Sequence, residues 1–496
     1  MAFALHNRWT DAATGSTDAL GEAVRAARLI GAEPELVLHG GGNTSVKVFE
    51  AGRAVMYVKG SGADLAQVSA RDYTPLALRP VQALLAADLP DNRAMYAALA
   101  PHVLRSDAPR PSIETLMHAG TQATHVIHTH AAAVLAVTNT RDAAHHLRAA
   151  FGPAVPVAPY RHSGLELARA CVAAWRPAAC PAPCAMVLAH HGALTWGASA
   201  REAHDAMLDL ANRAEAYLAR MGAPHVGDPS GAHPHGSAPQ GLDELIAVAR
   251  LRRRASRLAG RKLIATRRRG GFIGGFTRRA DLGDLTRHGP STPGHAIWTK
   301  RVPLIGRDAD TFAARYRDYL AGAFLAGETA VDCAPRVALD PQLGMIAMGV
   351  TKAYADIAAQ VFMHDAAIMS RAAALGGYAT IAPDLMRAAE LEYAGFEARA
   401  AAELPRAGEV HAVEHPGHGL DAVERLLGAG AAVVGITHDP AGARLIDHPA
   451  YLCVKADADG DHARGAIVDA FGGVDHIVAG SRWQTLLMPL LEAPHA

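Results

Sequence analysis

Two histidines, His128 and His130, stand two residues apart in a stretch rich in β-branched residues, and this spacing strongly constrains how the chain can fold. β-Branched residues favour an extended strand, in which side chains two apart point to the same face. In a strand over residues 124–130, His128 and His130 would share one face and His125 would point to the other. Two imidazoles on one face can bind a divalent ion when another element brings a further ligand. The chain has 27 histidines, so the pair alone is weak evidence for a metal site.

A third histidine and a carboxylate strengthen the metal hypothesis. Residues 185–189 are apolar enough for a second buried strand, which ends directly in His190 and His191. Because adjacent residues of a strand face opposite ways, we expect only one of these two to reach the ion. Glu114 lies upstream, in the expected first turn of a helix. Three protein ligands with one open position are typical of catalytic rather than structural zinc.

Five short motifs, in a fixed order along the chain, resemble the class II aldolase/adducin family. Each motif alone is weak, since glycine-rich turns and His-x-His pairs also arise by chance, but their order is specific. The motifs are His39-Gly-Gly-Gly-Asn-Thr-Ser45, Val58-Lys-Gly-Ser-Gly62, Pro111-Ser-Ile-Glu114, His128-Thr-His130 and His190-His-Gly-Ala193. The resemblance implies an α/β fold: a three-layer domain with a central sheet, which acts on ketose 1-phosphates with a divalent metal ion.

The resemblance also implies roles for individual residues. His128, His130 and His191 would bind Zn²⁺ or another divalent metal, and His191 is preferred to His190 because the family's ligand is the histidine before glycine. Glu114 would be the catalytic acid/base at the donor carbon of the substrate. Without the resemblance, we would expect a glutamate at this position only to stabilise the helix dipole.

The phosphate of the substrate is expected near the glycine-rich turn, where backbone amides and small polar side chains can bind an anion. By correspondence with the family, the expected ligands are Asn43, Ser61, Gly62 and Ser112. Ile113 stands where some members carry a second serine, which weakens this expectation. The family also uses a tyrosine to protonate the oxygen of the aldehyde. Tyr160 and Tyr217 are candidates that the sequence does not separate.

Composition and charge exclude several classes of partner. The chain has 48 basic and 48 acidic residues, so nothing indicates nucleic acid or a membrane, and a small-molecule sugar phosphate is the expected partner. The basic run from Arg252 to Arg269 is more typical of a solvated helix face than of an anion site. The first residues lack a basic segment followed by an apolar one, so we expect no signal peptide, and no uncharged apolar run reaches membrane-spanning length. The five cysteines, including Cys180 and Cys184, are expected to be reduced thiols of a cytoplasmic protein.

The length of 496 residues predicts several domains. Residues 1–225 alternate short strands with helices, as in an α/β domain. Residues 226–405 contain a linker rich in glycine and proline, then a helical connecting region that we expect to pack on the first domain. Motifs of this region resemble bifunctional rhamnulose-1-phosphate aldolase/short-chain dehydrogenase fusions: His288-Gly-Pro-Ser-Thr-Pro-Gly-His295, Thr299-Lys-Arg-Val-Pro-Leu304 and Glu390-Leu-Glu-Tyr393.

Residues 406–496 resemble a truncated, degenerate dehydrogenase-like module with a small Rossmann-like fold. When Gly417 and Gly419 are aligned with the glycine-rich turn of that family, Ala412 and Val413 stand where a threonine and the first glycine belong. A Cβ there obstructs the close approach of a pyrophosphate. The sequence ends at Ala496, before the Tyr-x3-Lys pair of that family. NAD chemistry is therefore not expected.

These observations favour a zinc-dependent aldolase that cleaves L-rhamnulose 1-phosphate, or a related deoxy-ketose phosphate, to dihydroxyacetone phosphate and an aldehyde. The resemblance makes a homo-oligomer the default. A pentulose-phosphate 4-epimerase shares the fold and the metal, but the connecting region argues against it. A non-catalytic adducin-like interaction protein should have lost at least one of the site residues, and His128, His130, His191 and Glu114 are all present.

Overall fold

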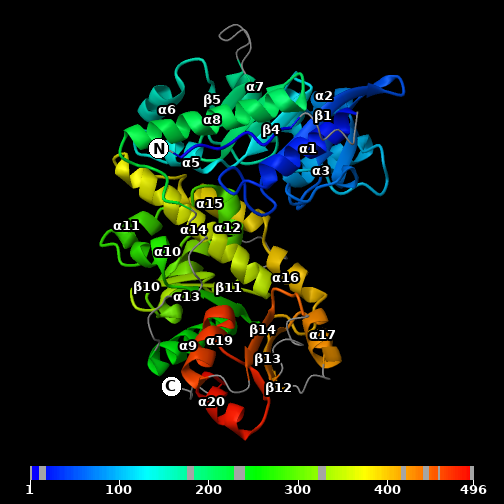
Figure 1. The fold of residues 1–496 in the computed structure, drawn as a ribbon. Helices are drawn as coiled ribbons and strands as arrows, with labels where there is room; N and C mark the ends of the chain where they lie inside the picture. The colour runs from blue at the N-terminus through cyan, green and yellow to red at the C-terminus, as the bar shows by residue number, and fades with distance from the viewer. Residues whose placement is uncertain are drawn as a thin grey trace. The chain divides into compact units, whose positions relative to one another are not determined.

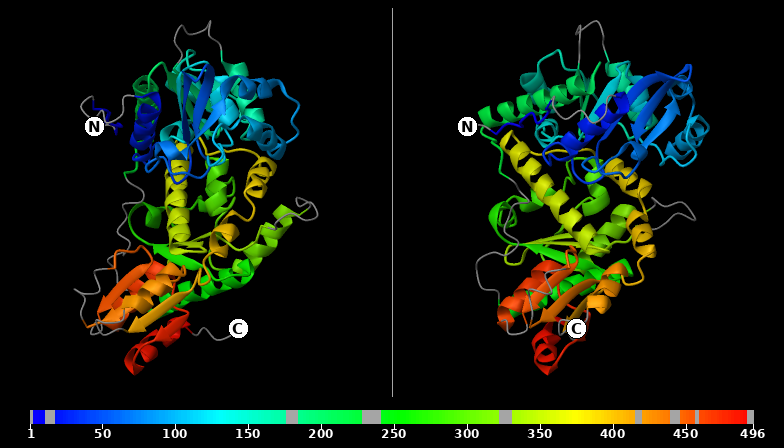
Figure 2. Two further views of the ribbon diagram at one scale, coloured as in Figure 1. Left: turned by 90° about the vertical axis from the view of Figure 1, so that its right-hand side faces the viewer. Right: turned by 45° about the vertical axis from the view of Figure 1, so that its right-hand side comes forward.

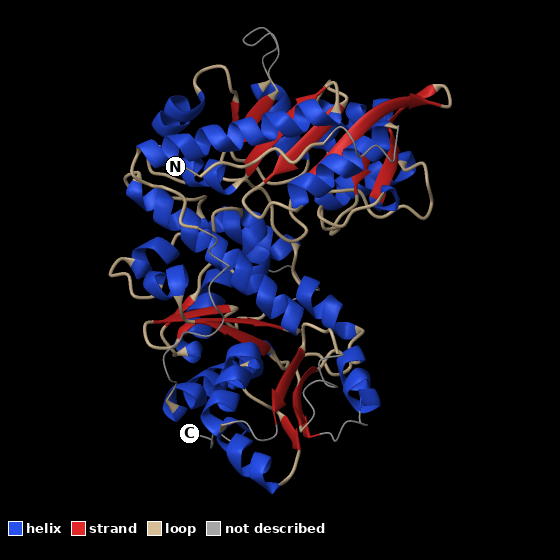
Figure 3. Cartoon of the chain, in the orientation of Figure 1, coloured by secondary structure: helices blue, strands red, loops and turns tan. Residues whose placement is uncertain are grey.

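A computed structural model describes residues 3–10, 18–175, 184–227, 241–321, 331–414, 420–438, 446–455 and 459–491. The chain forms two compact units. The first unit comprises Met1–His225 and Ile368–Ile381, and the second comprises Val226–Ala367 and Ala382–Ala496. Four residues discussed above lie outside the described residues: Cys180, Gly417, Gly419 and Ala496. Figure 3 shows the helices and strands of both units.

A seven-stranded mixed sheet, counted over the described residues, forms the middle layer of the first unit (Figure 1). Its strand order is β3-β2-β1-β4-β7-β6-β5, and every neighbouring pair is antiparallel except β5 and β6. The strands are β1 Asn43–Glu50, β2 Arg53–Lys59, β3 Tyr73–Ala77, β4 His125–Thr129, β5 Val157–Ala158, β6 Ala185–Leu188 and β7 Gly192–Gly197.

Helices cover both faces of this sheet, because successive side chains of each strand point to opposite faces. Ile127 packs with one helical layer and Val126 with the other. The first layer contains α1 Ala19–Gly31, α5 Ala132–Thr138, α6 Ala143–Phe151 and α8 Ala200–Arg220. The second contains α2 Leu78–Ala83, α3 Asn92–Leu99, α4 Thr115–Gly120 and α7 Leu165–Ala174, with the short 3-10 turns η1 Ala70–Asp72, η2 Leu84–Ala86 and η3 Ala100–His102 near them in sequence. The expected three-layer α/β fold is confirmed.

The first unit also includes the C-terminal end of a long helix, α14 Lys352–Ala374. A buried ion pair joins this end of the helix to α8. The Arg371 guanidinium donates to the two carboxylate oxygens of Glu215 on α8 at 2.9 and 2.5 Å. Its Nε also donates to the carbonyl oxygen of Ala223 at 3.2 Å. Both charged side chains are at most 4% exposed, so each neutralises a charge that would otherwise be costly to bury.

The second unit contains two four-stranded sheets over its described residues (Figure 2). The order β8-β11-β10-β9 is mainly antiparallel, and the order β14-β13-β12-β15 is entirely parallel, as in a small Rossmann-like module. The strands are β8 Ile264–Arg268, β9 Leu304–Ile305, β10 Val337–Asp340, β11 Gly344–Gly349, β12 Val410–Glu414, β13 Ala432–Thr437, β14 Tyr451–Lys455 and β15 His476–Val478. One apolar core contains residues of both sheets.

Helices surround these two sheets. They are α9 Leu242–Ala259, α10 Gly271–Phe276, α11 Leu282–Thr286, α12 Pro293–Thr299, α13 Ala309–Leu320, α15 Pro383–Glu392, α16 Phe396–Ala402, α17 Leu420–Gly428, α19 Gly460–Phe471 and α20 Ser481–Leu491. Among all described residues, no helix combines the length and the apolar character that crossing a bilayer requires.

The basic run of the second unit is only partly a solvated surface, so that prediction was partly wrong. Arg252, on α9, is 2% exposed; its Nε donates to the Leu263 carbonyl at 2.6 Å, and its guanidinium pairs with Asp475. Arg267, on β8, is fully buried, and its guanidinium lies 3.7 Å from Asp469. The carboxylates of Asp475 and Asp469, together with carbonyl oxygens, compensate these two charges. The number of charged residues along the sequence does not reveal such partners.

Candidate active site

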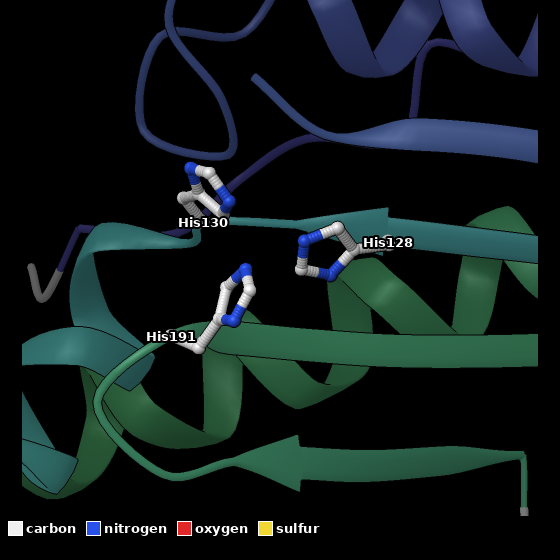
Figure 4. Close-up of side chains that lie close together, drawn as sticks. All are labelled: His128, His130 and His191. Carbon is white, nitrogen blue, oxygen red and sulfur yellow. The ribbon is translucent and has the colours of Figure 1, made fainter. Parts of the chain in front are cut away.

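Three histidines of the first unit meet at one end of its central sheet. His128 lies on β4, His130 follows the end of that strand, and His191 lies in the turn between β6 and β7. Their three rings face a common space (Figure 4), with centroids 5.0 to 5.2 Å apart. One nitrogen from each ring lies within 4.8 Å of the others. The structure thus brings together the three histidines that the sequence predicted as metal ligands.

The surroundings of His128 fit a metal ligand. Its ring is fully buried, and its Nδ1–H donates to the carbonyl oxygen of Ala193 on β7 at 2.9 Å. This bond fixes the tautomer that leaves the Nε2 lone pair available. The Nε2 atom is buried without a hydrogen-bond partner. Burial lowers the pKa of His128, which favours the neutral imidazole that metals bind. A backbone carbonyl that orients an imidazole in this way is typical of metal sites.

The turn before β7 decides which histidine enters the cluster. His190 has a φ of 56°, and its Nδ1 lies 2.6 Å from the side-chain oxygen of Asn139, away from the cluster. Gly192 has a φ of 149°, and a Cβ on it would lie 2.0 Å from the carbonyl oxygen of Thr129. Only glycine therefore lets this turn approach the end of β4 closely enough to place His191 beside the other two rings.

Glu114 points into the histidine cluster. One carboxylate oxygen lies 3.0 Å from His191 Nε2, and the other lies 3.5 Å from His128 Nε2. The residue is 5% exposed and immediately precedes α4, but its side chain makes no capping bond to that helix. Burial raises the pKa of Glu114, but the neighbouring imidazoles of His128 and His191 more than offset this and hold it well below its usual range. The helix begins at Thr115, later than the sequence predicted.

The expected phosphate ligands divide into two groups. Asn43 and Ser112 are buried beside Glu114: the Asn43 amide donates to Ser112 Oγ at 3.0 Å and to Glu114 Oε2 at 2.5 Å. Ser61 and Gly62 are exposed, and the Ser61 N–H donates to the Arg110 carbonyl at 2.8 Å. The side chain of Asn43 is thus engaged by its neighbours, whereas the second group lies open to solvent.

The two tyrosine candidates lie in different surroundings. Tyr217 is buried in α8, and its hydroxyl lies 2.7 Å from Nδ1 of His146, whose Nε2 lies 3.0 Å from the Leu375 carbonyl. Tyr160 follows β5 and is half-buried. The Tyr217 hydroxyl is therefore already engaged in the helical layer.

The comparison with protein families identifies two matching domains. Residues 22–218 match the class II aldolase and adducin N-terminal domain, and residues 243–399 match the second domain of class II aldolases. The N-terminal class II aldolase domain of a conserved protein from Thermoplasma acidophilum is 34% identical, with coverage of 43% of this chain and 100% of that one, at a TM-score of 0.40. The chain belongs to the class II aldolase/adducin family.

Other similar proteins are more distant from this class II aldolase family member. The uncharacterized oxidoreductase YuxG of Bacillus subtilis (strain 168) is 28% identical over 385 residues, or 73% of this chain and 55% of that protein. This chain therefore spans about half the length of that curated relative. L-fuculose-1-phosphate aldolase from Thermus thermophilus is 19% identical and covers 40% of this chain and 96% of its own, at a TM-score of 0.28.

Two buried residues near the site of this family member were missed as site residues from sequence. Lys59 is 2% exposed, and its Nζ donates to the carbonyls of Ala63 at 2.6 Å and Gly40 at 3.4 Å, so it ties together the two glycine-rich loops. His118 is fully buried and contacts Asn43. The position of His118 four residues after Glu114 was a usable signal, because residues four apart share a helix face.

Proposed function

We propose that this chain is a divalent-metal-dependent aldolase that cleaves a ketose 1-phosphate to dihydroxyacetone phosphate and an aldehyde. The observation that carries the proposal is the convergence of three imidazoles, His128, His130 and His191, with the carboxylate of Glu114 in a buried site. Family membership supports the same class of reaction. Glu114 would transfer protons, and the three histidines would hold the metal ion that stabilises the negative charge formed during cleavage.

The three histidines would bind the metal ion, with zinc as the proposed ion. Neutral imidazoles suit zinc, and three protein ligands leave a position open for substrate. When bound, the ion stabilises as a Lewis acid the negative charge that develops on the donor fragment. The carbonyl of Ala193 holds His128 in the tautomer that this requires. The proposed ligand set therefore agrees with the buried, unpartnered Nε2 of His128.

Glu114 would transfer the proton at the donor carbon. When the carbon–carbon bond breaks, its electron pair stays on the dihydroxyacetone phosphate fragment, and the hydroxyl that becomes the aldehyde loses its proton. Glu114, whose low pKa keeps it a carboxylate, would accept that proton. As the glutamic acid it would then deliver a proton to the donor carbon and return to the carboxylate form. A positioned acid/base typically accelerates such a step by about 100- to 10,000-fold. The absence of a capping bond from this side chain argues against a purely helix-stabilising role.

The phosphate would bind at the loops that carry Asn43, Ser61, Gly62 and Ser112. Lys59 supports this proposal, because it ties the Gly40 loop to the loop that follows β2. Gly40 and Gly42 have φ values of 68° and 62°, a conformation that favours glycine and exposes backbone amides. Since the Asn43 amide is already engaged, we expect backbone groups to contribute to phosphate binding.

The decisive experiment is a panel of ketose 1-phosphates, assayed for release of dihydroxyacetone phosphate by the purified, zinc-loaded protein. We propose L-rhamnulose 1-phosphate or a related deoxy-ketose phosphate as substrate. Epimerisation without release would identify a 4-epimerase instead. A protein that binds no divalent ion and turns over no substrate would refute both enzymatic proposals and support an adducin-like interaction role.

Substitution of Glu114 tests the proposed mechanism. Glu114→Ala should retain the metal and lose about 100- to 10,000-fold in kcat. Glu166→Ala is a matched control, because Glu166 is likewise a glutamate at the start of a helix, α7, but is exposed. Wild-type turnover by the Glu114 variant would remove this residue from the mechanism.

We also propose that residues 1–225, 226–405 and 406–496 act as three domains of a homo-oligomer.

A further inference from the structure

A continuous chain of buried polar groups leads from β1 through α4 to Glu114. Ser45 Oγ lies 2.8 Å from His118 Nδ1, and His118 Nε2 contacts the side-chain oxygen of Asn43. The Asn43 amide in turn donates to Glu114 Oε2 at 2.5 Å. The four residues are at most 5% exposed, so water does not compete for these bonds.

The chemistry of these groups fixes the direction of every hydrogen bond. A carboxylate only accepts, so the NH₂ group of Asn43 must face Glu114, and the amide oxygen must face His118. His118 Nε2 must then carry a hydrogen and donate it to Asn43. Burial lowers the pKa of His118 to about 3, so its ring is neutral, and its Nδ1 accepts from the Ser45 hydroxyl. The donors run in one direction, from Ser45 through His118 and Asn43 to Glu114.

We infer that His118 is a positioning residue of the active site, which locks the Asn43 amide so that its NH₂ group faces the Glu114 carboxylate and donates to it; this inference rests on the proposed aldolase function. Without a donor at residue 118, the Asn43 amide is free to turn over. Its oxygen would then face the carboxylate of Glu114, and the two acceptors repel each other. The Glu114 carboxylate would then no longer be held in the orientation that places its oxygens near His128 and His191.

The position of His118 suits this role because it lies on α4, the helix that begins directly after Glu114. His118 lies four residues after Glu114, and its backbone N–H donates to the Glu114 carbonyl at 3.2 Å. The imidazole makes no contact with the reacting atoms in this scheme, so it acts on catalysis only through Asn43. Loss of a side chain that orients a catalytic group typically costs about 10- to 100-fold in activity.

Two substitutions at residue 118 separate positioning from packing. His118→Met fills the space without a donor, whereas His118→Gln places an amide N–H near the position of the imidazole Nε2. We expect His118→Met to lower kcat about 10- to 100-fold, with bound zinc and KM little changed, and His118→Gln to recover most of the loss. His125→Met is the matched control, since His125 is a buried histidine on β4 whose side chain takes no part in this chain of bonds.

A second readout does not depend on turnover. The protein has five asparagines, so selective ¹⁵N-asparagine labelling gives five side-chain amide signals, and the Asn43 signal is assigned with Asn43→Asp. Hydrogen exchange of the Asn43 amide should be at least about tenfold faster in the Met variant and near wild type in the Gln variant, as expected for loss of one buried hydrogen bond.

The outcomes distinguish the two proposals. A wild-type protein that releases no dihydroxyacetone phosphate refutes the proposed function, while the Asn43 signal still decides whether residue 118 locks the amide. Three results would each overturn the positioning role. The first is the same kcat in wild type and His118→Met, and the second is the same loss of kcat in His118→Met and His118→Gln. The third is a rate of hydrogen exchange at the Asn43 amide that does not change with the residue at position 118.

Discussion

Lys47 is a buried cation whose removal should stabilise the protein in a pH-dependent way. It lies on β1, and its Nζ donates to Thr121 Oγ1 at 3.0 Å and to the Ala123 carbonyl at 2.9 Å. No carboxylate pairs with it in the part of the chain that the structure describes. The residue as a whole is half-buried, and burial lowers the pKa of Lys47 from 10.5 to about 7.

The magnitude and the sign follow from these two pKa values. Between about pH 7 and pH 10.5 the unfolded chain carries the proton and the folded chain does not, so wild-type stability rises with pH in this window. At about 1.4 kcal/mol per pH unit, burial of the charged form costs about 5 kcal/mol below pH 7. Lys47→Met removes this cost. Its stability relative to wild type should fall by about 4 kcal/mol between pH 6 and pH 10.

Urea unfolding of wild type and Lys47→Met at pH 6 and pH 10 measures this difference. Lys455→Met, which removes an exposed lysine from β14, is the control and should show no such change. The protein has six lysines, so lysine labelled with ¹³C at Cε gives six signals whose titration is followed directly. The same pH dependence in wild type and the variant, or a Lys47 signal that titrates near pH 10, would refute the reasoning.

Three further predictions concern the first unit. Gly192→Ala should lower zinc affinity about 10- to 100-fold by isothermal titration calorimetry, because its Cβ would lie 2.0 Å from the Thr129 carbonyl; Gly152→Ala, with positive φ but no close contact, should bind zinc normally. Arg371→Met should lower the free energy of urea unfolding by about 3–5 kcal/mol, because Glu215 is left buried and unpaired, and a change below 1 kcal/mol would contradict this. Removal of zinc with a chelator should lower the free energy of unfolding by about 4 kcal/mol, compared with protein kept in free zinc at about 1,000 times its Kd. The melting temperature should fall accordingly, and an unchanged melting temperature would argue against a bound ion.

Local patterns predicted much of the candidate site. The β-branched stretch around His128 does form β4, and the period of two places Val126 on one face and Ile127 on the other. His128 is two residues after Val126 and therefore points to the same face of the sheet, the face covered by the helical layer that contains α4. Glu114 lies at the start of that helix. The parity argument worked because strand geometry is local and needs no knowledge of distant residues.

Predictions that depended on distant partners were less complete. The Pro111 segment was expected to open the helix, but the chain remains in a turn until Thr115, where Ser112 accepts hydrogen bonds from Asn43 and Glu114. Arg252 was grouped with solvated charges, but it is buried against Asp475, a residue far away in sequence. Asn43 and Asp475 are both far in sequence from the segments that they contact, so no pattern within a short segment reports these two contacts.

The sequence by itself determined the family, the strand that carries His128, and the set of residues able to bind a metal, because motif order and strand period are written along the chain. Only the tertiary structure decided the rest. The close turn at Gly192 places His191 in the histidine cluster, whereas the side chain of His190 contacts Asn139 instead. The packing of β1 against α4 creates the bonds from His118 to Glu114. These features arise where the sheet brings distant segments within bonding distance, and that proximity is a property of the folded chain alone.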